Sequence, residues 1–157
     1  MRILFPIAIL FISISCQPTQ DFPTTILLDN RFTDEQVEDI FSCLEQWKYA
    51  TGGIADMIGI QNGTSVRPKN FSEFQDLDNH EMIIVHSYDN VVMEYAEEKE
   101  VAPSNVAGFA SIKGIAIVID NITIGNNHDN HDKWRYAFRH VVLHEAGHFV
   151  GLLHLTN

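Results

Sequence analysis

The sequence HEAGHFVGLLH near the C-terminus limits what this chain can fold into more than any other feature. Its first two histidines, His144 and His148, lie four positions apart, so on a helix their imidazoles share one face, one turn apart. Gly151 offers the helix a place to end because glycine accepts the left-handed conformation, and the chain can then bring His154 back. Three converging imidazoles suit a tetrahedral zinc ion whose fourth position stays open to water, which Glu145 could reach.

Two other interpretations of these histidines remain open. The segment could be a histidine-rich amphipathic helix whose imidazoles are only solvated or paired with other groups. His140 lies one turn before His144 and could act as a ligand in place of His154. Three ligands in one straight helical row would enclose a metal poorly, so we expect His154 to complete the ligand set.

This stretch resembles the H-E-x-x-H-x-x-G-x-x-H signature of the metzincin clan of zinc endopeptidases. The resemblance implies that one catalytic Zn²⁺ is bound by three ligands, namely His144, His148 and His154. It also implies that Glu145 is the general base and that Gly151 forms the turn. The implied function is hydrolysis of a peptide or protein substrate by zinc-activated water. The alternative is a non-catalytic, metzincin-like lipoprotein that binds zinc or peptide without turnover.

The likeness extends more weakly over residues 24–154, and the layout is most like that of a small bacterial matrixin-type peptidase. It implies an α+β or α/β zincin fold: a twisted mixed sheet of about five strands with an antiparallel edge strand, packed on two long helices. The second of these helices would carry the motif. Metzincins place a methionine-containing turn after the third histidine, and no methionine follows His154. We therefore expect a catalytic domain over residues 24–157 that lacks this turn and has a truncated C-terminal subdomain.

Short patterns along the rest of the chain predict the other elements. Thr33 and Gln36 form a capping box before apolar residues at helical spacing, and Gly52-Gly53 ends this helix. Short apolar runs predict strands over residues 24–29, 54–60 and 81–87. Polar and turn-rich composition predicts a loop over 61–80, and a solvated loop or short helix over 88–104. The helix that carries the motif is expected over residues 134–150.

A hairpin is predicted just before this last helix. Residues 106–112 and 115–119 read as its strands and flank a turn at Lys113-Gly114. In metzincins a strand in this place lies antiparallel at the sheet edge, and the substrate backbone pairs with it. By resemblance, the edge would be formed by Gly108, Phe109, Ala110 and Ser111. A plain hairpin without a role in binding is an equal alternative.

The N-terminus is typical of an export signal. Arg2 precedes a short apolar run that is too short to span a bilayer, so residues 1–15 are interpreted as a signal peptide. The sequence before Cys16 resembles a bacterial lipobox. We therefore expect Cys16 to carry lipid, with residues 16–23 as a tether, in a cell-envelope lipoprotein at the outer membrane or cell surface. Secretion after ordinary signal cleavage is the alternative. The second cysteine, Cys43, is expected to be a small, partly buried apolar residue in a helix.

The acidic composition excludes some partners. With 10 basic and 21 acidic residues and a net charge of −11, the chain should not bind nucleic acid or anionic lipid through charge. Membrane contact is therefore expected only through the lipid anchor. Residues 125–132 could hold a structural Ca²⁺ or Zn²⁺, or could form a polar loop in which Asn130 or Asp132 caps the next helix. His80 and His86 are expected on loops or the surface. Neither the oligomeric state nor the cleavage preference follows from the sequence.

Overall fold

The computed structural model describes residues 21–61, 67–122 and 131–153. These residues form one five-stranded sheet with the strand order β2-β1-β3-β5-β4. The strands are β1 (Thr24–Leu28), β2 (Met57–Gln61), β3 (Glu81–Val85), β4 (Gly108–Ser111) and β5 (Gly114–Val118). All neighbouring strands are parallel except β4, which runs antiparallel to β5 at one edge. The expected mixed sheet of about five strands with an antiparallel edge strand is therefore confirmed.

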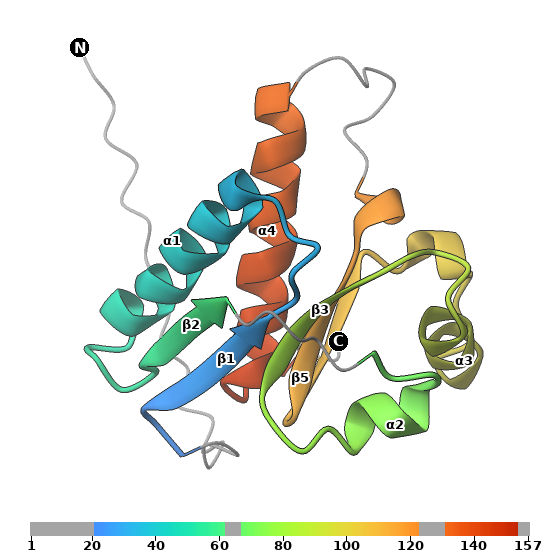
Figure 1. The fold of residues 1–157 in the computed structure, drawn as a ribbon, viewed down its shortest axis with the longest axis horizontal. Coiled ribbons are helices and arrows are strands. Elements are labelled where there is room, and N and C mark those ends of the chain that lie inside the picture. Colours follow the sequence, from blue (N-terminus) through green and yellow to red (C-terminus); the bar gives the residue numbers. More distant parts are fainter. Residues whose placement is uncertain (1–20, 62–66, 123–130, 154–157) are drawn as a thin grey trace.

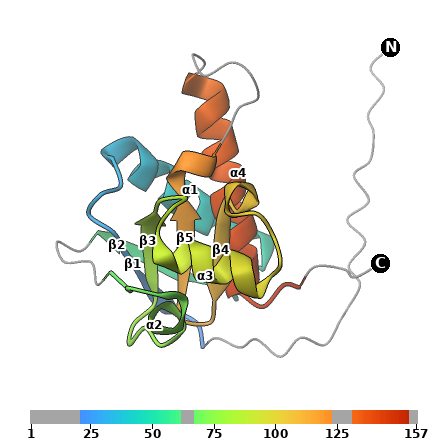
Figure 2. The ribbon, with the colours of Figure 1, turned by 90° about the vertical axis from the view of Figure 1, so that its right-hand side faces the viewer.

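Helices cover both faces of this sheet (Figure 1). The helices are α1 (Asp34–Ala50), α2 (Phe71–Gln75), α3 (Asn90–Glu98) and α4 (His131–Phe149), with short 3-10 turns at Pro103–Asn105 and Ile119–Asn121. The long helices α1 and α4 lie together on one face, and α2 and α3 lie on the other (Figures 1 and 2). Each face has its own apolar core, so every residue of the central strands β3 and β5 is buried. Within the described ranges, no helix combines the length and apolar character needed to cross a membrane.

The predicted start and end of α1 are both present. The Gln36 N–H donates to Thr33 Oγ1 at 3.3 Å, and the Thr33 N–H donates to Gln36 Oε1 at 2.9 Å. This reciprocal pair satisfies two backbone donors that the first helical turn leaves open. After the helix, Gly52 and Gly53 have φ values of 63° and 92°, a region that glycine adopts at low cost. Cys43 is fully buried inside the helix, and burial raises the pKa of its thiol to about 11.

Polar contacts join α1 to α4 where their side chains leave the apolar core. The carboxylate of Asp39 is 2 % exposed and lies 2.6 Å from Arg135 Nε and 3.1 Å from Arg139 Nη1. Further along, the Trp47 Nε1–H donates to the carbonyl oxygen of Leu143 at 2.9 Å. These contacts fix the position of α4, the helix that carries the histidine motif, relative to α1.

Two predictions for the segment between α1 and β3 are wrong. Strand β2 begins at Met57 and not at residue 54, because the Ile54 and Ala55 N–H groups bond back to Thr51 in a turn. The segment expected to be a loop over residues 61–80 contains α2. Asn70 caps this helix by accepting from the Glu73 N–H at 2.8 Å. A helix this short shows no periodicity in the sequence, so composition alone suggested a loop.

The hairpin has a different register from the predicted one. Ser111 lies opposite Gly114, so the turn residues are Ile112 and Lys113, and Gly114 is the first residue of β5. A Cβ on Gly114 would lie 2.8 Å from the carbonyl oxygen of Glu81, so glycine is needed there for close approach to β3. Over residues 88–104, where a loop or a short helix was open, the structure shows α3. Helix α4 begins at His131, three residues before the predicted start.

Candidate metal centre

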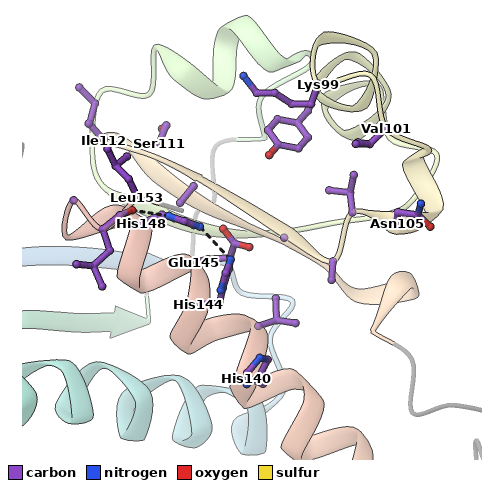
Figure 3. Close-up of a pocket in the computed structure, with 18 residues that line it drawn as sticks. Lys99, Val101, Asn105, Ser111, Ile112, His140, His144, Glu145, His148 and Leu153 are labelled. Atoms are coloured by element: carbon purple, nitrogen blue, oxygen red, sulfur yellow. Dashed lines mark hydrogen bonds between the residues drawn. The ribbon is translucent and has the colours of Figure 1, made fainter. Parts of the chain in front are cut away.

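Helix α4 brings His144 and His148 together at the rim of a cleft (Figure 3). Their Nε2 atoms lie 3.1 Å apart. Two nitrogens bound to one tetrahedral zinc at ~2.05 Å would be separated by about 3.3 Å. The observed separation therefore fits a metal held between the two rings, as the spacing of four residues predicts.

The end of α4 orients one of these rings. The Gly151 N–H donates to the His148 carbonyl and the Leu152 N–H to that of Gly147, both at 2.9 Å, in the paired bonds of a Schellman motif. Gly151 has a φ of 98°, as expected of a turn residue. The turn places the Leu152 carbonyl 2.7 Å from His148 Nδ1. Because a carbonyl can only accept, Nδ1 carries the proton, so in a neutral ring the lone pair of Nε2, the atom that faces His144 Nε2, is the one that could bind a metal.

The side chain of Glu145 lies between the backbone of α4 and the edge strand β4. It is 6 % exposed, and burial raises the pKa of its carboxyl to about 7. A Cβ on Gly108 would lie 2.8 Å from Glu145 Cγ and 3.0 Å from a methyl carbon of Val141, so β4 can approach α4 only with glycine at this position. The carboxyl is thus held beside the two imidazoles, with a proton affinity suited to proton transfer near neutral pH.

Sequence reasoning missed a contact inside the motif itself. A Cβ on Gly147 would lie 2.9 Å from Cζ2 of Trp47, so the indole packs directly against the helix between the two histidines. Together with the bond from Trp47 to the Leu143 carbonyl, this packing supports the turn of α4 that presents His144 and His148. The signal available in the sequence was a glycine in a helix interior, a position where close packing is a common reason for it.

The cleft has a volume of about 970 Å³ and two different walls. The α4 wall carries His140, His144, Glu145 and His148, whereas residues of α3 and the following turn form the opposite wall (Figure 3). On that opposite wall, burial and secondarily the charge of Glu145 raise the pKa of Tyr95, so its phenol stays neutral. No motif in the sequence pointed to the α3 wall.

The predicted edge strand divides between the cleft and the core. Gly108, Ala110 and Ser111 line the cleft. Phe109 is 2 % exposed and points to the other face, where its ring stacks on Tyr95 with centroids 4.3 Å apart. Phe109 can therefore contribute only its backbone to the predicted substrate-binding edge, because its side chain packs against Tyr95 of α3.

Several other predicted residues lie away from the two histidines. His80 Nδ1 is 2.7 Å from Thr24 Oγ1, and His86 Nδ1 is 3.1 Å from Asp120 Oδ1. Asp132, one of the two expected helix caps, lies inside the first turn of α4 and so does not cap it. His154, Cys16, Asn130 and most of residues 125–132 lie outside the described residues.

The described residues thus bring two imidazoles together, with the buried carboxyl of Glu145 beside them. Within residues 21–61, 67–122 and 131–153, no group of three or more His, Cys, Asp or Glu side chains is arranged to hold a metal ion. The donor chemistry nevertheless suits zinc, because two neutral imidazoles with facing Nε2 atoms are typical zinc ligands. Comparisons with models of protein families, with curated proteins and with solved structures find no match to this chain.

Proposed function

We propose that this protein is a zinc-dependent endopeptidase of metzincin type. The proposal depends on one observation above all: the Nε2 atoms of His144 and His148 face each other at 3.1 Å, with the buried carboxyl of Glu145 beside them. The open cleft gives a substrate access to this point. The third ligand in this proposal is His154, on the strength of the motif alone.

The chemistry assigned to each residue follows from its place. When bound, zinc supplies a water of lowered pKa and polarises the scissile carbonyl. His144 and His148 would hold the metal, and the hydrogen bond from His148 Nδ1–H to the Leu152 carbonyl keeps that ring in the tautomer that metal binding at Nε2 needs. Glu145 accepts a proton from the attacking water and later delivers one to the leaving amine. Its burial favours this exchange because it brings the carboxyl pKa close to neutral pH.

The edge strand β4 supplies a way to bind a peptide. Among the described residues β4 pairs only with β5, so the backbone groups of its outer edge face the cleft. A peptide added there as a further strand would be held by main-chain hydrogen bonds, with little dependence on its sequence. This arrangement supports a peptide or protein substrate.

A non-catalytic metzincin-like protein that binds zinc or peptide is the second candidate. It is favoured by the finding that the described residues bring only two imidazoles together. In either case we propose an exported lipoprotein anchored through Cys16, a proposal that depends on the N-terminal sequence alone. Replacing Cys16 with serine should release the protein from the membrane fraction. Retention of that variant in membranes would contradict the anchor.

Removal and return of the metal tests the proposed activity. The full chain, stripped with a chelator and then dialysed, is assayed on a fluorogenic peptide library before and after zinc is added back. An endopeptidase of this type shows no cleavage when stripped and regains it with about one equivalent of zinc. Stoichiometric zinc binding without any cleavage would instead support the non-catalytic candidate. Cleavage that persists in the stripped protein would contradict both.

A further inference from the structure

The α3 wall of the cleft carries a charge that the proposed peptidase chemistry does not use. Apart from histidines, the titratable side chains that line the cleft within the described part of the chain are Tyr95, Lys99 and Glu145. Glu145 is buried in the α4 wall, whereas the side chain of Lys99 is 50 % exposed. A chain with a net charge of −11 therefore presents an accessible cation inside this cleft.

The backbone at Lys99 is firmly placed. Lys99 caps α3, and its N–H donates to the Tyr95 carbonyl at 3.0 Å. The next residue, Glu100, has a φ of 54°, and the Val101 N–H closes the turn on the Ala96 carbonyl at 3.0 Å. A residue other than glycine in the left-handed region costs about 1 kcal/mol. The turn that places Lys99 at the cleft therefore contains a backbone conformation that is unfavourable in free energy.

Helix α3 is also fixed relative to the edge strand. Tyr95 stacks on Phe109 of β4, with ring centroids 4.3 Å apart and planes at 13°. Phe71 packs edge-on against both rings, at centroid distances of 5.2 and 5.8 Å. Lys99 is one turn from Tyr95, so this aromatic cluster sets its distance from the outer edge of β4.

A strand added at that edge would point alternate side chains to opposite faces of the sheet. Those on one face would meet His144, Glu145 and His148, and those on the other would meet the α3 wall. Figure 3 shows Lys99 on the opposite side of the β4 ribbon from His148 and Glu145. A substrate carboxylate directed to the α3 face would therefore find a cation, whereas a lysine or arginine would meet repulsion.

We propose that Lys99 selects peptides with an acidic side chain at the position that faces α3, so that the cleft prefers acidic peptide segments. This inference depends on the proposed peptide-binding function of the β4 edge. Glu98 Oε1 lies 2.7 Å from Lys99 Nζ, but this pair is half-exposed on both sides, and such pairs contribute little. A substrate carboxylate can therefore compete for the ammonium group.

Equilibrium binding tests the proposal without depending on turnover. The probes are short fluorescein-labelled peptides of alanine and leucine that carry one Glu, or one Gln, at each position in turn. At one position the Glu peptide should bind the full chain roughly fivefold more tightly than the Gln peptide. Lys99→Gln should abolish this ratio, and Lys99→Glu should invert it. The ratio should also shrink at about 0.5 M NaCl because the interacting groups are partly solvated.

Lys69→Glu is the matched control for Lys99→Glu, because both replacements change the net charge by the same amount. Lys69 is exposed and does not line the cleft. A Glu preference that survives Lys99→Gln, or that Lys69→Glu removes as well, would overturn the role of Lys99. The same peptides are then assayed for zinc-dependent cleavage. Cleavage with no difference between Glu and Gln peptides overturns the Lys99 proposal alone. A Lys99-dependent preference without cleavage overturns the endopeptidase alone, and absence of peptide binding overturns the Lys99 proposal and the β4 docking site together.

Discussion

The two helices that border the cleft, α3 and α4, end with the same backbone turn, but a different type of residue occupies the left-handed position in each. At the end of α4 the left-handed position is Gly151, with φ of 98°, and at the end of α3 it is Glu100, with φ of 54°. Both turns close with the paired bonds of a Schellman motif. Only the α4 end could be predicted, because glycine marks it in the sequence.

The walls that these helices form differ in the same way. The proposed metal chemistry uses two imidazoles one helical turn apart with a carboxyl beside them, so His144, Glu145 and His148 form a pattern that is visible in the sequence. The α3 wall only has to be brought near the substrate, and the packing of Tyr95 on Phe109 achieves this without any local pattern. Under the proposed function, a local sequence pattern therefore predicts the reaction, whereas the proposed substrate preference depends on tertiary packing.

The largest expected effect concerns the α4 wall. Glu145→Gln keeps the size of the side chain but removes its ability to take a proton, so kcat/KM for a cleaved peptide should fall about 10²–10⁴-fold. The zinc content, measured by atomic absorption, should stay equal to that of the parent. Glu38→Gln, at an exposed position of α1 that does not line the cleft, provides the control and should keep its activity. If the Glu145→Gln variant stayed active, Glu145 would not be the general base, and the α4 wall would not differ from the α3 wall in the way proposed.

A smaller loss is expected where the edge strand touches the α4 wall. In a Gly108→Ala variant the added Cβ would lie 2.8 Å from Glu145 Cγ, so the carboxyl must move. A displacement of about 1 Å can reduce turnover roughly 10²-fold, and kcat should therefore fall while zinc binding persists. Thr25→Ala, at an exposed position of β1 that does not line the cleft, should change kcat little. Unchanged turnover in Gly108→Ala would show that the position of Glu145 is not critical.

A buried acid away from both walls offers a reference for stability. Burial alone would raise the pKa of Asp29, but the hydrogen bonds and charge of Arg31 outweigh it and lower the pKa below its usual value. Its stabilisation is therefore complete above about pH 4 and is lost as the pH falls through the lowered folded-state pKa. Urea titrations should show the parent losing stability below pH 4. Asp29→Asn should cost about 2 kcal/mol at pH 7 and flatten this acid limb. An equally steep acid limb in the variant would contradict the assignment.

The smallest effects compare the two helix ends directly. Gly151→Ala forces a Cβ into the left-handed region and should lower the free energy of unfolding by about 1–2 kcal/mol. Glu100→Gly relieves the same strain on α3, with a net gain of roughly 0.5 kcal/mol after the added flexibility of the unfolded chain. Chemical denaturation measures both changes. Changes of the same sign in the two variants would show that the two turns are not equivalent.

Elements with a repeating pattern or a strong cap could be predicted from the sequence. The capping box of Thr33 and Gln36, the apolar run of β3 and the histidine spacing on α4 each depend on neighbours within a few residues. Features that depend on distant contacts were missed or misplaced. Gly114 was predicted to be a turn residue because its close approach to β3 leaves no local signal in the sequence. Helix α2 is too short to show periodicity. The contact of Trp47 with Gly147 depends on how α1 packs against α4.

Zinc calorimetry of the full chain and two single variants tests the central claim most directly. If His144 and His148 hold the metal, the parent binds one equivalent of zinc and His148→Ala loses most of that affinity. His140→Ala removes the neighbouring imidazole of the same cleft and should bind zinc as the parent does. Zinc binding that survives His148→Ala, or that disappears in His140→Ala, would contradict the account.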